Sequence, residues 1–176
     1  MEKTITKEMM HAARTYLPLE EKTKFVRECA PRCFDRLKVE LIDGEEAPPL
    51  YMVNSELKGR YLMGALIRRY LGIAVEHEET DEDLMTAADY DLWAGSHAVN
   101  QIERWKSDRD LRDRCFDLLA DYHDLEKRLN AEIQGMLTAQ NDPVTRQSMM
   151  TRADMERLPA LLEEVRRMQE ARAERK

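Results

Sequence analysis

The sequence is poor in the residues that break helices and in the patterns that form strands. Its 176 residues include six glycines and six prolines, and no continuous alternating run of Val, Ile and Thr occurs. Leu, Met, Ala, Glu and Arg dominate, and these side chains lose little rotamer freedom in a helix. We therefore predict an all-α, multi-helix fold without β-strands.

Long apolar segments and export signals are also absent. No stretch approaches the roughly 20 apolar residues that a membrane span requires, and residues 1–6 lack the apolar core of a signal peptide. The three cysteines are an odd number in a chain without an export signal, which favours reduced thiols. We expect a cytoplasmic protein without membrane contact.

The motifs of common catalytic sites are missing as well. The sequence has no Gly-rich phosphate loop, no Gly-x-Ser-x-Gly and no His-Glu-x-x-His. Active sites are assembled in space from residues that can be far apart in the sequence, so the absence of these motifs does not exclude an enzyme. It nevertheless favours a binding protein, and we assign no catalytic residue, no metal site and no cofactor.

The segment 108–140 has the most regular pattern. Apolar residues recur every three or four positions, at Leu111, Cys115, Leu118, Tyr122, Leu125, Leu129, Ile133 and Met136. This near-heptad spacing predicts one helix on the order of 50 Å long, at ~1.5 Å per residue. Asn141-Asp142-Pro143 ends it and can start a second amphipathic stretch. Together the two arms predict a long, coiled-coil-like antiparallel helical hairpin.

Two domains follow from this pattern: a helical bundle at 1–107 and the hairpin at 108–176, which could be continuous with the bundle. Residues 43–49 contain turn formers and two prolines, which indicate a linker. Helices are expected at 4–15, at 18–29 with a short continuation at 33–37, at 54–72, and from 81 or 86 to 106 with a bend at Gly95 and Ser96. The helix at 54–72 has the widest apolar face, and it is the candidate for a central, buried helix.

A hairpin of this length has apolar seams on both sides, which predicts association with a second copy of the chain. The seam carries a leucine in nearly every heptad. The candidate oligomer seam consists of Leu111, Leu118, Leu125 and Leu129.

The acidic residues are concentrated in one band. The net charge is −7, and residues 76–91 contain eight acidic residues and no Lys or Arg, so the rest of the chain sums to about +1. Three interpretations stay open: a solvated loop leading into a helix, a docking surface for a basic partner protein, or a divalent cation site. The candidate docking residues are Glu76, Glu78, Glu79, Asp81, Glu82 and Asp83.

The helix expected at 54–72 is locally basic. Lys58, Arg60, Arg68 and Arg69 could contact nucleic acid, or the last two could pair with the acidic band that follows. Because the overall charge is acidic, we do not expect nucleic acid as a partner.

Two short motifs raise the question of a metal. Cys29 and Cys33 are four residues apart, and Glu8 and His11 have the Glu-x-x-His spacing of helical di-iron sites. A zinc site needs two further soft ligands, and a di-iron site needs a second copy of its motif. Core cysteines and a surface Glu–His pair are therefore the simpler interpretations.

Three hypotheses of function remain. The leading one is a self-associating adaptor or regulator that binds another protein through the hairpin and the acidic band. The second is a small acidic inhibitor that blocks a nucleic-acid-binding enzyme. In size and charge alone, the chain is similar to small phage-encoded inhibitors such as anti-CRISPR proteins. The third is a metal-dependent helical enzyme.

Overall fold

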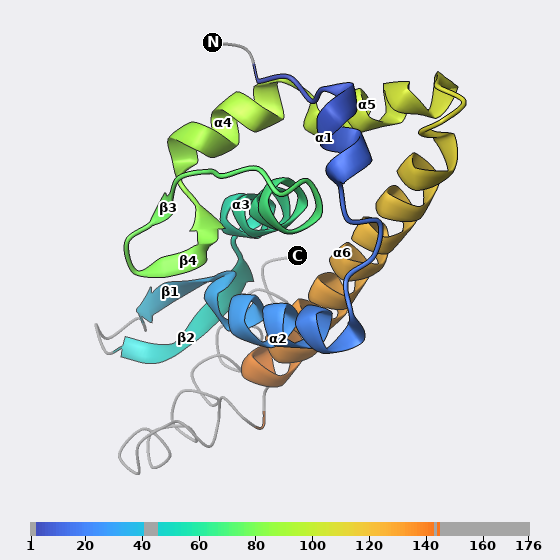
Figure 1. The fold of residues 1–176 in the computed structure, drawn as a ribbon. Helices are drawn as coiled ribbons and strands as arrows, with labels where there is room; N and C mark the ends of the chain where they lie inside the picture. Colours follow the sequence, from blue (N-terminus) through green and yellow to red (C-terminus); the bar gives the residue numbers. More distant parts are fainter. Residues whose placement is uncertain (1–2, 41–45, 143, 145–176) are drawn as a thin grey trace, which may run out of the picture. The chain divides into compact units, whose positions relative to one another are not determined.

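The computed structural model describes residues 3–40, 46–142 and 144. They are mostly helical and end in one long helix, α6 (Arg112–Asn141) (Figure 1). The chain divides into two units, Met1–Asp35 with Met52–Met136 and Arg36–Tyr51 with Leu137–Lys176. The division at residue 107 into a helical bundle and a hairpin stays a prediction. None of the helices in the described ranges is long and apolar enough to cross a membrane.

Side-chain caps begin three helices, at one of the two starts expected for α4 (Ala87–Gly95) and within three residues of the starts expected for α1 (Lys7–Ala12) and α3 (Ser55–Gly64). Thr6 caps α1, and Asn54 caps α3 through the Leu57 N–H at 2.9 Å. Thr86 caps α4 in the same way. A side-chain oxygen at this position satisfies a backbone N–H that has no partner inside the helix.

Proline and glycine lie at the ends of several helices, and the bend expected at Gly95 and Ser96 is a break between two helices. α2 (Leu19–Cys29) follows Pro18 and passes into the short 3-10 helix η1 (Ala30–Arg32), which contains Pro31. The chain turns after Gly95, and α5 (Ala98–Arg104) and the 3-10 helix η3 (Trp105–Ser107) follow.

The core of the first unit forms around the helix that the sequence marks as central. α3 continues into a π-helix, η2 (Ala65–Tyr70), and together they bury Tyr61, Leu66, Ile67 and Tyr70. α2 and α6 run beside one another in this unit, as an ion pair between Lys22 and Asp121 shows (Figure 1).

The prediction that the chain has no β-strands is wrong. The described residues contain two two-stranded sheets, one of β1 (Phe34–Glu40) and β2 (Glu46–Val53), the other of β3 (His77–Glu78) and β4 (Asp81–Met85). The helical continuation expected at 33–37 is the start of β1, and the helix start expected at Asp81 is β4. The chain is therefore mostly helical but not all-α.

The linker expected at 43–49 is likewise partly a strand, because β2 starts at Glu46 and contains Pro48 and Pro49. A sheet of two strands consists only of edges, where a proline lacking an N–H is tolerated. In the second unit, Tyr51 of β2 exchanges hydrogen bonds of 3.1 and 2.9 Å with the side chain of Asn141.

The predicted hairpin is seen only in its first arm. That arm is the single helix α6, close to the expected bounds. The second arm, expected beyond Pro143, lies outside the described residues except for Val144. A coiled-coil pairing of two long helices is therefore not observed within the described ranges.

Candidate functional site

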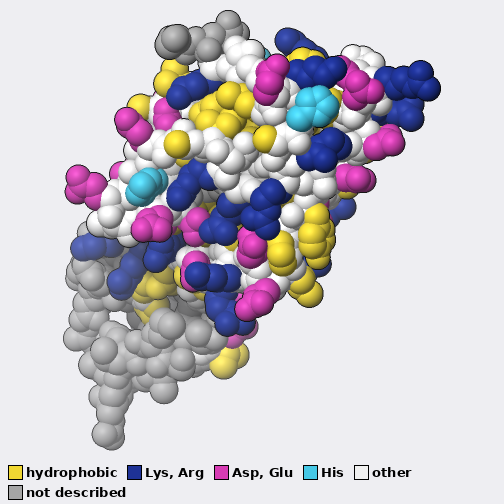
Figure 2. Space-filling view, in the orientation of Figure 1, with side chains coloured by type: hydrophobic (Ala, Val, Ile, Leu, Met, Phe, Trp, Pro, Cys, Tyr) yellow, Lys and Arg dark blue, Asp and Glu magenta, His cyan; other side chains and the backbone are white. Residues whose placement is uncertain are grey.

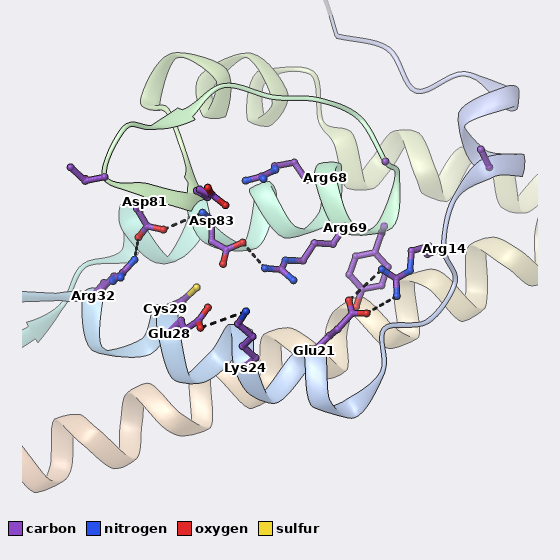
Figure 3. A pocket seen from close by; sticks show the side chains of 15 residues that line it. Arg14, Glu21, Lys24, Glu28, Cys29, Arg32, Arg68, Arg69, Asp81 and Asp83 are labelled. Atoms are coloured by element: carbon purple, nitrogen blue, oxygen red, sulfur yellow. Dashed lines mark hydrogen bonds and ion pairs between the residues drawn. The ribbon is translucent and has the colours of Figure 1, made fainter.

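A cavity of about 810 Å³ opens between α2, η2 and the β3–β4 hairpin of the first unit (Figure 3). Fifteen residues line it and ten of these are charged, and we call it the charged cleft. Its cations are Arg14, Lys24, Arg32, Arg68 and Arg69, and its acidic residues are Glu21, Glu28, Asp81, Glu82 and Asp83.

One wall of the charged cleft is a face of α2. Glu21, Lys24 and Glu28 are spaced by three and four residues, which places them along one side of the helix. Glu21 accepts hydrogen bonds of 3.0 and 3.3 Å from Arg14, which precedes α2. Lys24 and Glu28 form a looser ion pair of 4.0 Å between two exposed side chains. This wall therefore carries mixed charge.

The opposite wall is β4. Side chains alternate along a strand, and Asp81, Asp83 and Met85 share one side. Asp81 pairs with Arg32, Asp83 pairs with Arg69 at 2.5 Å, and Met85 is buried. The alternation thus directs two carboxylates toward the cations of neighbouring elements, while Glu82 between them is exposed.

The floor of the charged cleft is the π-helix η2. The Leu71 N–H donates to the Leu66 carbonyl five residues earlier, at 3.1 Å, which is the π pattern. Gly72, with a φ of +66°, ends the segment in a conformation that favours glycine. Two consecutive arginines, Arg68 and Arg69, line the cleft from this floor.

The pairing inside the charged cleft is incomplete. Four cations and four carboxylates form the pairs Arg14–Glu21, Lys24–Glu28, Arg32–Asp81 and Arg69–Asp83. The side chain of Arg68 is half-buried and forms no ion pair or hydrogen bond with any described residue. The Glu82 side chain also lacks a partner among the residues that the structure describes. One cation and one anion of the cleft are therefore unpaired within the part of the chain that the structure describes.

Asp81 is the most constrained of the cleft's carboxylates. Burial opposes its ionisation, but hydrogen bonds from the Tyr61 hydroxyl and from Arg32 outweigh burial and lower the pKa of Asp81. Burial, together with the hydrogen bond to Asp81, raises the pKa of Tyr61. Asp81 therefore stays charged at neutral pH and fastens the β3–β4 hairpin to α3 and η1.

The predicted acidic band divides into paired and free carboxylates. Glu78 pairs with Arg60, a buried arginine of α3 whose Nε also donates to the Met85 carbonyl at 2.8 Å. Asp81 and Asp83 form ion pairs inside the charged cleft. One interpretation of the basic helix was that Arg68 and Arg69 pair with the acidic band, and Arg69 does so through Asp83. Exposed carboxylates without a partner in the described part of the chain belong to Glu76, Glu79, Glu82 and Asp91.

The two cysteines considered as metal or redox groups lie in the core. Burial raises the pKa of the Cys29 thiol, and it raises the pKa of the Cys33 thiol to about 11. The Cys33 thiol donates to the Cys29 carbonyl oxygen at 3.3 Å. Both residues are therefore thiols at neutral pH, whereas nucleophilic attack and metal binding require thiolates.

Glu8 and His11 are exposed on the short helix α1. A backbone hydrogen bond and then one from the Thr6 hydroxyl lower the pKa of Glu8, so its carboxylate belongs to the N-terminal cap of the helix. Across the described ranges, no group of three or more His, Cys, Asp or Glu side chains could hold a metal ion.

The four leucines of the predicted oligomer seam are in the core of a single chain. Leu111, Leu118, Leu125 and Leu129 each have 0% of their surface exposed. The near-heptad pattern is therefore satisfied by packing inside the first unit. Self-association stays a prediction, and it would need another surface.

A buried polar cluster went unnoticed in the sequence. Asp121 of α6 accepts hydrogen bonds from the Leu17 N–H at 2.9 Å, from the Tyr70 hydroxyl at 2.8 Å and from Lys22 at 2.5 Å. We call these four groups the Asp121 cluster. Lys22, 3% exposed, keeps a raised pKa because its hydrogen bonds to Asp121 and Asp124 outweigh the burial that lowers it.

The positions of Lys22 and Asp121 in the sequence could have indicated this cluster. Lys22 shares a helix face with Phe25, Val26 and Cys29, and Asp121 shares one with Leu118, Tyr122 and Leu125. Two opposite charges on two apolar faces predict a buried pair, because neither charge could be buried alone.

Comparison with known proteins gives no relative. No protein-family model, no curated protein and no solved structure shows a significant match to this chain.

Proposed function

We propose that this chain is an adaptor or regulator that works by binding another protein through the charged cleft. The observation that carries the proposal is a surface cavity lined by five cations and five carboxylates, of which one cation and one carboxylate have no ion-pair partner among the described residues. Such a lining offers charge-assisted hydrogen bonds to a partner that also carries both signs of charge.

The mixed lining supports a protein partner over a nucleic acid. Arg32 and Arg69 are already paired with Asp81 and Asp83, and the exposed carboxylate of Glu82 on the same wall would repel a phosphate backbone that approached Arg68. Figure 2 shows Lys and Arg side chains interspersed with Asp and Glu side chains on the visible face. A nucleic-acid surface would instead gather cations into a patch or stripe.

The pairing of charges in the cleft also supports a binding function over a catalytic one. Most charged groups of the cleft are held in ion pairs, and the thiol at its edge, Cys29, has a raised pKa. A general acid or base would need a pKa near the working pH and a free path to the substrate.

A second candidate is the small acidic inhibitor of a nucleic-acid-binding enzyme. The exposed carboxylates of Glu76, Glu79, Glu82 and Asp91 favour it, because a mimic of nucleic acid needs free anions. The pairing of Glu78, Asp81 and Asp83 with arginines leaves fewer anions for such a role. We therefore rank it second.

Affinity capture from a lysate of the producing cells, read by mass spectrometry, tests the proposal with matched variants. The cleft variant combines Arg68→Glu with Glu82→Lys, which reverses both unpaired charges and keeps the net charge. The control combines Arg109→Glu with Asp117→Lys at two exposed positions outside the charged cleft.

We expect a specific protein to be captured by the native chain and by the control, and to be lost from the cleft variant. Equal capture by all three would contradict binding through the cleft, and recovery of the chain alone would contradict the proposed function. A variant with Glu76, Glu79 and Asp91 changed to Gln or Asn separates the second candidate. If that variant alone loses a nuclease or polymerase, the inhibitor hypothesis replaces the proposal.

A further inference from the structure

We infer that the charged cleft takes a linear segment of the partner that presents a carboxylate to Arg68 and a cation to Glu82. The inference rests on the proposed function and adds the chemistry of the partner. It comes from one asymmetry: four cations in the cleft have a carboxylate partner within the chain, and Arg68 has none among the described residues.

Arg68 is suited to bind a carboxylate. Its guanidinium is planar and presents donors in a fork that matches the two oxygens of a carboxylate. Its position on η2 is between the buried residues Ile67 and Tyr70, so its backbone is held by the core. A fixed backbone lowers the entropy that binding must overcome.

The neighbouring arginine is already occupied. Arg69 pairs with Asp83 at 2.5 Å, and its guanidinium lies over the Phe25 ring at 5.3 Å from the ring centre. These contacts leave Arg68 as the cation on the floor of the cleft that is available to a partner. They also explain why two adjacent arginines have different roles.

Glu82 supplies the complementary charge. It is exposed on β4, while its neighbours Asp81 and Asp83 are turned toward Arg32 and Arg69. No ion pair joins Glu82 to Arg68, so a partner can engage each of them separately.

The charges of the wall favour a carboxylate over a phosphate group. A phosphate carries up to two negative charges, and the exposed carboxylate of Glu82 lines the same cleft as Arg68. Repulsion from Glu82 grows with the charge of the ligand. A segment with one Asp or Glu side chain and a nearby Lys or Arg could pair with Arg68 on the floor and with Glu82 on the wall.

Selection from a displayed library of short random linear peptides tests this inference. The native chain, Arg68→Glu, Glu82→Lys and the control Arg109→Glu are used separately as the immobilised target. Circular dichroism checks that each variant is folded, as we expect because neither cleft side chain has a partner in the described part of the chain.

We expect the native chain and the control to enrich peptides with an acidic position, and Arg68→Glu to enrich peptides with Lys or Arg there. Native-selected peptides should bind Arg68→Glu about tenfold more weakly. Glu82→Lys should change the preference at a basic position to an acidic one.

Enriched peptides without an acidic position, or equal binding to Arg68→Glu, would overturn the inference. Failure to enrich any peptide would overturn it as well, because a linear segment should be found by this selection. Neither result decides the proposed function, since a folded partner would still be captured by the native chain and lost from the cleft variant. Conversely, if affinity capture recovers no partner, the proposed function fails whatever the peptides show.

Discussion

The charged cleft and the Asp121 cluster are both built from charged side chains of the first unit, but they differ in completeness. In the Asp121 cluster, three donors meet one buried carboxylate, and Lys22 finds a second acceptor in Asp124. In the charged cleft, Arg68 and Glu82 have no partner in the described ranges, and most side chains are exposed or half-exposed.

The difference follows from the energy of burying charge. A buried ion that loses its partner is strongly destabilising, so a buried cluster must be complete for the chain to fold. At the surface, water solvates an unpaired charge at little expense, so a chain can keep one available for a partner. We therefore interpret the Asp121 cluster as structural and the charged cleft as the binding site.

The substitution Asp121→Ala should give the largest effect. It leaves the buried Lys22 with the more exposed Asp124 in place of a buried partner, and it removes the acceptor of the Tyr70 hydroxyl and the Leu17 N–H, so we expect a loss of about 3–5 kcal/mol in the free energy of unfolding. Urea denaturation measures it. Asp117→Ala, one turn earlier on α6 at an exposed position, is the control and should stay within about 0.5 kcal/mol. A loss as small as the control's would show that the cluster is not structural.

Gly64 of α3 packs closely against β4, which forms one wall of the cleft. Its replacement should have the next largest effect on stability. A Cβ at Gly64 would lie 3.1 Å from the Asp83 carbonyl oxygen, whereas one at Gly135 of α6 would meet nothing within 4 Å. Gly64→Ala should therefore destabilise the protein by roughly 1–2 kcal/mol. Gly135→Ala should stabilise it by about 0.5–1 kcal/mol, because alanine is the better helix former. Thermal unfolding of both variants checks the two signs, and equal shifts would contradict the close packing of β4 on α3.

The ion pair of Asp81 should give a smaller effect that depends on pH. Asp81→Asn removes the charge that pairs with the half-exposed Arg32, so we expect a loss of roughly 0.5–1 kcal/mol at pH 7. The pKa of Asp81 is lowered by folding, from an unfolded value of about 3.9. Its contribution is therefore complete above that pH and is lost as the pH falls through the folded pKa.

Urea denaturation of the native chain and of Asp81→Asn across this pH range measures the difference between them. The difference should stay constant from pH 7 to about pH 4 and shrink toward zero as the pH falls further through the folded pKa of Asp81. A difference that does not shrink below about pH 4 would mean that the carboxylate form of Asp81 does not fasten the hairpin.

The smallest effect on stability is expected at Arg68. Arg68→Ala removes no ion pair or hydrogen bond to a described residue, so the free energy of unfolding should change by no more than about 0.5 kcal/mol. Arg69→Ala is the matched neighbour, and it should destabilise the chain by roughly 1 kcal/mol through the loss of Asp83 and the Phe25 ring. Binding of the selected peptides should nevertheless weaken in Arg68→Ala. If Arg68→Ala is as unstable as Arg69→Ala, then Arg68 has a structural role.

Several features of the fold could be predicted from neighbouring residues alone. Thr6, Asn54 and Thr86 mark the starts of three helices, and Gly72 marks the end of another, because caps satisfy backbone groups within a few residues of the helix end. The long helix α6 was predicted from its apolar period. What its apolar side packs against was not predicted, since the period is the same for an intramolecular core and an oligomer seam.

The strands and the site could not be predicted in this way. Asp and Glu are uncommon in strands, and the two-residue turn Glu79-Thr80 lacks the Asn-Gly signal of a hairpin. β4 nevertheless forms beside residues far away in sequence, where Arg32 and Arg69 pair with its alternate carboxylates. The sequence could show only that acidic residues are concentrated at 76–91, and it could not show which arginines they pair with.

The sequence by itself determined the mostly helical composition of this protein, the ends of its helices and the uneven distribution of its charge, because these depend on local propensity and capping. The tertiary structure alone decided which charges pair. Glu78, Asp81 and Asp83 looked like a free acidic band and are neutralised by arginines from other elements, while Arg68, one residue before a paired arginine, is left without a partner among the described residues. Coulombic pairing acts over a few ångströms in space and is indifferent to separation along the chain.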